Sequence, residues 1–225
     1  MGLDPDHASF SKKALGLFSS QKAAQAGIRY LDRGVHTVAH YRSPLTGDVL
    51  PIDIYSNPFQ PDFLNASWSF TYLPYPSEEA TSAWKGAPRR ADAVPIWVSH
   101  GPPEHRLDNI DIPGLKGCTA QAAAVAAARP ILSVFGHYHQ SNGIERVRWA
   151  EKTDDVVDAE MLTVGSEKAK KQVWDFSEQR PQAGKETLFV NAAWKTYHGP
   201  KREGEQKTNE PFVVILPLPF HDKTG

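Results

Sequence analysis

The sequence has little cysteine, no long apolar run and no excess of charge of one sign. Its single cysteine, Cys118, excludes an internal disulfide framework and a cysteine-based zinc finger, and it fits a reducing, cytoplasmic compartment. The longest apolar stretch, residues 212–220, is short and contains Pro217 and Pro219, so we expect no membrane span. Because 25 basic and 26 acidic side chains give a net charge of -1, we expect neither nucleic acid nor an anionic membrane as a partner.

What the sequence does contain is one strong helix pattern among several short strand patterns. The helix pattern covers residues 117–129, of which seven are alanine, and it ends at Pro130. Strand patterns occur at residues 35–41, 50–55, 94–99, 131–135, 143–149, 187–190 and 212–216. Strands on both sides of a helix predict an α/β fold, and the alternating strands near the start predict mixed β-sheets.

The length of 225 residues predicts a single domain, 1–225. Within it, residues 74–92 resemble a loop or a weak helix, because they are rich in proline, serine and charged residues. Residues 150–185 are polar and poorly patterned, and we interpret them as an insertion that is partly helical around residues 166–173.

Two of the apolar strand patterns end in histidine. Residues 94–99 lead into His100, and residues 131–135 lead into Gly136, His137, Tyr138 and His139. A helix between the two strands would return the chain so that they lie parallel and adjacent. Ligands bind at the carboxyl edge of such sheets. We therefore predict that His100, His137 and His139 converge on one crevice as metal ligands.

The spacing of the last two histidines supports this prediction. In an extended segment, residues i and i+2 point to the same side, which would direct His137 and His139 toward one site. Gly136 lacks a Cβ and would let the backbone approach that site closely. Imidazole is a common ligand of zinc, iron and similar divalent ions.

A longer ordered set of motifs resembles the calcineurin-like metallophosphoesterases, specifically a small single-domain subgroup. The matching segments are VSHGPP at 98–103, LD at 107–108, GC at 117–118, FGHYH at 135–139, Gly143 and VNAA at 190–193, with IYSNPFQP at 54–61 and WSF at 68–70 upstream. The resemblance covers most of residues 28–216 outside 150–185. It implies the C-terminal part of a four-layer sandwich with mixed β-sheets.

The resemblance also implies a function. The family binds two divalent metal ions (Mn, Fe or Zn), of which His100 and His137 would hold one and His139 the other, and it hydrolyses phosphoesters. We expect a small phosphoester as the substrate. Four further residues would lie near the ions without binding them: Gly136, Asn191, Asp108 and His105.

The three motifs that open this family, Asp-x-His, Gly-Asp and Gly-Asn-His, are missing. They would supply the bridging carboxylate and the catalytic histidine, so no catalytic residue is assigned; Gly47 and Asp48 lie in a predicted turn. We therefore expect an N-terminally truncated domain that holds fewer metal ions or none and has weak or no activity alone. A non-catalytic interaction domain and a mononuclear hydrolase with three histidine ligands stay open as alternatives. The oligomeric state also stays open.

Overall fold

The protein is described here by a computed structural model. The structure describes residues 12–13, 15–43, 46–63, 70–74, 76–90, 94–110, 115–164, 173–194 and 211–217. The chain divides into two compact units, residues 1–32 and 33–225, where the sequence predicted one domain. In the first unit, helix α2 (Gln21–Gln25) begins after Ser20, whose hydroxyl accepts a hydrogen bond from the Ala23 amide at 3.2 Å.

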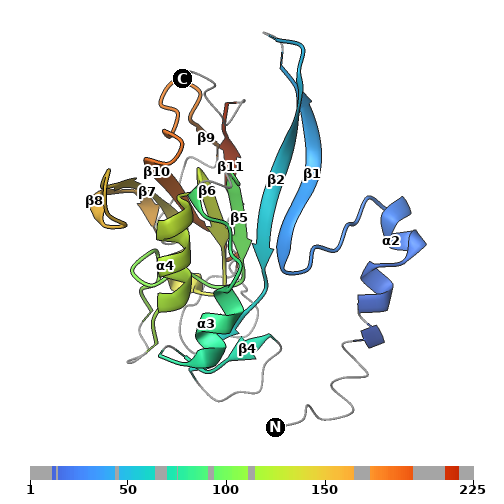
Figure 1. The fold of residues 1–225 in the computed structure, drawn as a ribbon, viewed down its shortest axis with the longest axis horizontal. Coiled ribbons are helices and arrows are strands. Elements are labelled where there is room, and N and C mark those ends of the chain that lie inside the picture. Colours follow the sequence, from blue (N-terminus) through green and yellow to red (C-terminus); the bar gives the residue numbers. More distant parts are fainter. Residues whose placement is uncertain are drawn as a thin grey trace, which may run out of the picture. The chain divides into compact units, whose positions relative to one another are not determined.

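A seven-stranded mixed sheet is the centre of the second unit (Figure 1). In spatial order its strands are β1 (Gly34–Arg42), β2 (Val49–Asn57), β5 (Ile96–Ser99), β6 (Leu132–Phe135), β10 (Glu186–Asn191), β7 (Gly143–Trp149) and β8 (Val156–Val164). The four strands from β2 to β10 are parallel neighbours, and the pairs at both edges are antiparallel. The predicted α/β class with mixed pairing is confirmed.

The remaining elements are short. They are β3 (Gln60–Pro61) paired with β4 (Thr71–Tyr72), β9 (Val173–Asp175) paired with β11 (Val213–Ile215), the helices α3 (Glu78–Trp84) and α4 (Thr119–Ala128), and the 3-10 turn η2 (His139–Ser141). No helix among the described residues is both long enough and apolar enough to cross a bilayer.

Helices α3 and α4 cover one face of the sheet (Figure 1). On that face Tyr55 and Trp97 are paired on adjacent strands and bury all but 2% of their surfaces, and Phe189 is fully buried. Trp84 of α3 stacks on Trp97 with their ring centroids 6.5 Å apart. Val98, one residue further along β5, points to the opposite face and is 38% exposed. The apolar run at residues 94–99 therefore forms a strand that is well buried on only one of its two faces.

Helix α4 matches the predicted helix closely. Cys118 precedes it, and its thiol accepts the Gln121 amide at 3.2 Å, so the first turn is capped. The helix ends at Arg129, which adopts the left-handed conformation with φ of 52°, and Pro130 follows. This ending turns the Arg129 side chain back into the protein, where it is 1% exposed.

Of the two segments interpreted as irregular, residues 74–92 contain the short helix α3, in agreement with the weak-helix alternative, and Ser77 caps it by accepting the Ala80 amide at 2.9 Å. The second segment needs correction. The proposed insertion at 150–185 contributes β8, which extends the main sheet, and β9. The pattern of β8 (VVDAEMLTV) is hard to recognise because Asp158 and Glu160 interrupt its hydrophobic residues, and pairing with β7 stabilises the strand. The predicted helix around 166–173 lies outside the described residues except for Val173, which begins β9.

The turn predicted before β2 is present. Gly47 has φ of 74°, and the Ser43 amide donates to the Asp48 carbonyl at 2.8 Å. Asp48 thus belongs to the hairpin between β1 and β2, which extends beyond the neighbouring strands (Figure 1).

Candidate functional site

The site begins at the carboxyl ends of two adjacent parallel strands. His100 follows β5 and His137 follows β6 after Gly136, and the two strands pair directly. The Gly136 amide donates to the His100 carbonyl at 2.9 Å, so the strand ends stay joined. His100 Nε2 lies 3.2 Å from His137 Nδ1, and the ring centroids are 4.7 Å apart. The predicted convergence of these two histidines is present.

His139 does not join them in the way that the sequence predicted. The strand ends at Phe135, His137 has a positive φ of 68°, and His139 begins η2. The i, i+2 argument holds only for an extended backbone, so it fails at a chain reversal. Among the described residues, no three histidine, cysteine, aspartate or glutamate side chains form a group that would hold a metal ion.

The protein holds both paired imidazoles toward the neutral form. Burial and, to a smaller extent, the nearby charges of His100 and His139 together lower the pKa of His137 to about 4. Partial burial of the ring also lowers the pKa of His100, although the residue borders solvent. At neutral pH each imidazole therefore keeps a lone pair that a hydrogen bond or a metal ion can use.

Gln121 positions the His100 loop from the first turn of α4. Its side-chain amide donates to the Ser99 hydroxyl at 2.8 Å and to the Gly101 carbonyl at 3.2 Å, and the residue is 2% exposed. These bonds fix the residues on both sides of His100. Sequence reasoning missed Gln121, because a glutamine inside an alanine-rich helix gives no signal of what it contacts.

Asn191 positions the other loop. It ends β10, is fully buried, and donates through Nδ2 to the Tyr138 carbonyl at 2.8 Å and the Leu107 carbonyl at 3.3 Å. Tyr138 separates His137 from His139, so this bond fixes the backbone between them. Asn142 donates in turn to the Asn191 carbonyl at 3.0 Å. The structure thus gives Asn191 a role in supporting the loop.

Asp108 and His105 belong to the loop between β5 and α4. The Asp108 carboxylate accepts the amides of His105 and Gly117, each at 2.8 Å, so it closes this loop. The His105 side chain is 80% exposed, and its ring lies 3.9 Å from the Glu104 carboxylate. Both residues shape the loop after His100. Among the described residues, neither joins two other histidine, cysteine or acidic side chains in a group that could hold a metal ion.

Of the two glycines Gly117 and Gly136, only Gly117 lies so close to neighbouring backbone that a larger residue would not fit. A Cβ on Gly117 would lie 2.4 Å from the Pro103 carbonyl oxygen, a distance that no real Cβ tolerates. A Cβ on Gly136 would meet its nearest atoms, those of Ala193, at 3.8 Å, which is ordinary contact. Packing within the protein therefore does not require a glycine at position 136, and the predicted close approach of its backbone to a bound ligand stays a prediction.

Comparison with known proteins gives one partial match. The chain is 33% identical over 100 residues, 44% of its length, to the probable rhamnogalacturonate lyase C of Emericella nidulans. Those residues make up 8% of that protein, so the chain spans a small fraction of its relative. No family model matches the chain.

These findings overturn the family resemblance. The partial relative carries the name of a polysaccharide lyase, and nothing found is a metallophosphoesterase. The assignment to the calcineurin-like family is therefore wrong. The matching motifs were short and consisted largely of glycine, proline, histidine and asparagine at strand ends, where α/β folds commonly place such residues.

Proposed function

We propose that His100 and His137 bind one divalent metal ion. The observation behind this proposal is the 3.2 Å separation between His100 Nε2 and His137 Nδ1. Two imidazole nitrogens on one tetrahedral zinc-like ion, each about 2.05 Å from it, would be about 3.3 Å apart. The two ring nitrogens are therefore as far apart as they would be on a shared ion. An N–H···N hydrogen bond also fits the distance, so the proposal needs a direct metal measurement.

The lowered pKa values favour the same proposal. A histidine must be neutral to bind a metal, and the pKa of His137 is about 4. Gln121 and Asn191 hold the loops that carry the two rings, so the backbone on both sides is fixed before any ion arrives. Preorganised supporting contacts of this kind strengthen metal sites.

We further propose that this site hydrolyses a small phosphoester. Both ligands are neutral, so the site would keep the full charge of its ion, which favours an anionic substrate. A bound divalent ion would supply Lewis-acid polarisation and charge compensation at a phosphate group. His139, whose charge acts on His137, lies within electrostatic range of the same position. Its imidazole N–H is a donor for phosphate oxygens.

Two finer predictions accompany this proposal. A second ion near His139 and a four-layer sandwich both require elements additional to the described sheet and helices. Carboxylates from such elements would complete the coordination that the histidines begin. Without them we expect weak metal binding and weak turnover, because neutral ligands alone do not offset the charge of two ions.

Metal binding is the decisive experiment. The purified chain is dialysed to equilibrium against a series of Mn²⁺ or Zn²⁺ concentrations, and the bound metal at each concentration is measured by mass spectrometry. We expect one ion per chain, and at least about tenfold weaker binding in His100→Ala and in His137→Ala. His40→Ala is the control, because His40 is exposed on β1. Equal metal content in all variants would exclude the paired histidines.

Activity is measured separately on bis-p-nitrophenyl phosphate with the same ions. Turnover that disappears in His137→Ala and persists in His40→Ala supports the hydrolase proposal. A metal ion bound without turnover supports the alternative of a metal-binding interaction domain. Turnover that His137→Ala leaves unchanged contradicts the proposal.

The name of the partial relative gives a second candidate, cleavage of rhamnogalacturonate by a lyase reaction. The support is narrow, because the matched residues form 8% of that protein. Incubation with rhamnogalacturonan, followed by ultraviolet absorbance of newly formed unsaturated ends, tests it. An increase that His137→Ala leaves unchanged would favour this activity over the hydrolase and place it away from the histidine pair.

A further inference from the structure

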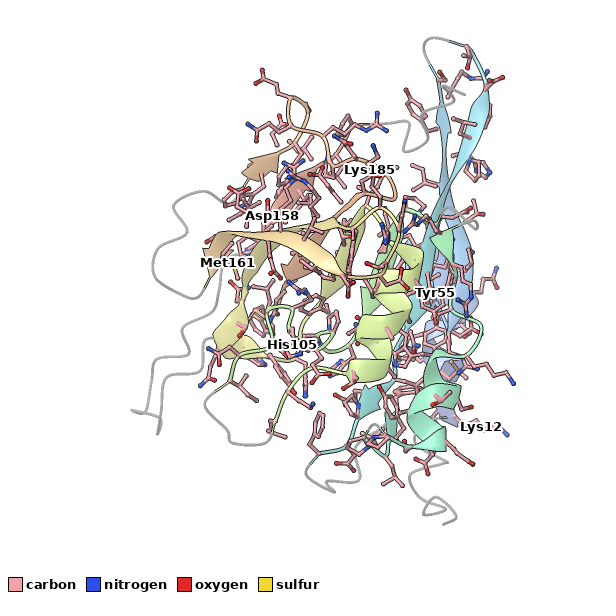
Figure 2. All side chains as sticks on the ribbon, turned by 60° about the vertical axis from the view of Figure 1, so that its left-hand side comes forward. Lys12, Tyr55, His105, Asp158, Met161 and Lys185 are labelled. Carbon is pink, nitrogen blue, oxygen red and sulfur yellow. The ribbon has the colours of Figure 1, made fainter. Side chains whose placement is uncertain are left out.

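A cavity lies near the amino-terminal ends of β6 and β10, whereas the histidine pair lies at the carboxyl ends of β5 and β6. Its volume is about 300 Å³, and four cationic side chains line it: Arg90, Arg129, Arg148 and Lys185. Arg129 lies three residues before the start of β6 and Lys185 immediately precedes β10, whereas His137 follows the end of β6. Strand β6 spans four residues, about 13 Å of extended chain. Figure 2 shows Lys185 and His105 toward opposite ends of the sheet.

We propose that this cavity binds a tetrahedral oxyanion, either free phosphate or the phosphate group of a small molecule. The four cations come from four separate segments of the chain, and the fold brings them together around one space. Clusters of arginine and lysine are the usual protein partners of phosphate, because guanidinium and ammonium groups donate several charge-assisted hydrogen bonds.

Arg129 supplies a fixed buried charge at this cavity. Its guanidinium is 1% exposed and donates to the carbonyls of Ala150 at 2.7 Å, Gly184 at 3.3 Å and Thr153. Carbonyls satisfy the donors but carry no net charge. Its carboxylate partner, Asp154, is 3.5 Å away and 61% exposed, so solvent weakens that pairing. Much of the positive charge therefore acts on the cavity.

Two other cations are available for direct contacts. Arg90 and Lys185 are both exposed, and no carboxylate among the described residues is paired with either of them. The Arg90 side chain lies against Gly184, where a Cβ would be 3.7 Å from its Cδ. Burial and the charge of Arg90 lower the pKa of Arg129, and the Asp154 carboxylate partly opposes that effect. A bound anion would relieve the repulsion between the two arginines.

The acidic residues at the cavity do not cancel this charge. Glu186 already accepts hydrogen bonds from Arg146 and from the Gln182 amide, each at 3.0 Å, and lies 3.6 Å from Arg148. Glu151 is exposed to solvent. Four cations against two carboxylates leave a formal excess of two positive charges on the lining. Asp154 and Asp158 pair with Arg129 and Arg148 from outside the lining, but both are 61% exposed, so solvent weakens their effect on a bound anion.

The size and walls of the cavity limit the ligand. A volume of about 300 Å³ is at the lower end of the range for small-molecule sites, so the ligand is a phosphate with at most a small organic body. The indole of Trp149 forms one wall, with the Arg129 guanidinium 5.7 Å from its ring centroid. An aromatic wall suits a short carbon skeleton attached to the phosphate.

Calorimetric titration with inorganic phosphate tests the proposal. The full chain is titrated in EDTA, so that the histidine pair holds no metal, against sodium chloride of equal ionic strength as the screening control. We expect phosphate to bind and to raise the melting temperature. The variant Arg90→Ala/Lys185→Ala should lose at least about tenfold in affinity, because it removes both directly available donors.

The matched control is Lys85→Ala/Arg89→Ala. It also removes one lysine and one arginine, but from exposed positions outside the cavity lining. Binding in this control should stay within about twofold of the unmodified chain. Equal losses in both double variants, or no binding to the unmodified chain, would overturn the proposal. Repeating the titration with glycerol phosphate separates the two sources: tighter binding than inorganic phosphate identifies a phosphorylated small molecule, and weaker binding identifies the free ion.

Discussion

The side-chain amide of Asn191 donates to the carbonyl of Tyr138 at 2.8 Å, directly between the two histidines of the FGHYH segment. The same amide reaches the Leu107 carbonyl at 3.3 Å, so one buried residue joins the loops that follow β5, β6 and β10. The reversal that places His137 beside His100 thus depends on a neighbour far away in the sequence.

Replacing Asn191 with alanine should destabilise the protein and weaken metal binding together. The substitution leaves two carbonyls without their donor in a site that is fully buried, which we expect to cost about 2–4 kcal/mol of unfolding free energy. Urea denaturation and metal titration measure the two effects. Asn109→Ala is the control, since that residue is exposed. Unchanged stability in Asn191→Ala would contradict the role assigned to this side chain.

The histidine pair should make stability depend on pH. His137 has a folded-state pKa of about 4 against an ordinary value of 6.5, so the unfolded chain takes up a proton first as the pH falls. The contribution of His137 is therefore complete above about pH 6.5 and decreases as the pH falls toward 4. Unfolding free energy is measured between about pH 4.5 and 6.5 for the unmodified chain and for His137→Asn. The unmodified chain should show the steeper decrease; equal slopes would show that His137 is not held neutral.

Two glycines near the site should differ in how much stability an alanine substitution costs. Gly117→Ala places a methyl group 2.4 Å from the Pro103 carbonyl oxygen, and we expect a loss of about 1–3 kcal/mol. Gly136→Ala meets atoms no closer than 3.8 Å and should change stability by less than about 0.5 kcal/mol. Thermal denaturation of the two variants side by side checks this. A larger loss of stability in Gly136→Ala would show that the protein requires a glycine at position 136.

The buried ion pair between Arg106 and Glu145 offers a further test. Their side chains meet at 2.7 Å and are 17% and 7% exposed. Burial raises the pKa of Glu145, and the charge of Arg106 opposes that rise. Arg106→Leu leaves the carboxylate buried alone and should cost about 3–5 kcal/mol.

The double substitution Arg106→Leu/Glu145→Leu removes both charges and should recover most of that loss. Denaturant unfolding of the single and double variants measures the coupling between the two residues. A double variant no more stable than Arg106→Leu would show that the arginine acts mainly through its packing over Phe189, 6.0 Å from the ring centroid.

The sequence predicted those features that residues close together in the chain specify. Seven alanines specify α4, and the alternating and apolar patterns specify the strands of the main sheet except β8. The strand–helix–strand rule then placed His100 and His137 at neighbouring strand ends, which the pairing of β5 with β6 confirms. The family inference failed because strand-end motifs report a common local arrangement more than they report ancestry.

By itself, the sequence determined that two histidines would end adjacent parallel strands, because hydrophobic periodicity and chain connectivity act over short distances. Only the tertiary structure decided where His139 turns, since the positive φ at His137 depends on contacts such as the Asn191 bond. It also decided that Arg90, Arg129, Arg148 and Lys185 share one cavity. These cations are far apart in the chain, and no local pattern encodes their meeting, because the sheet and the left-handed end of α4 bring them together.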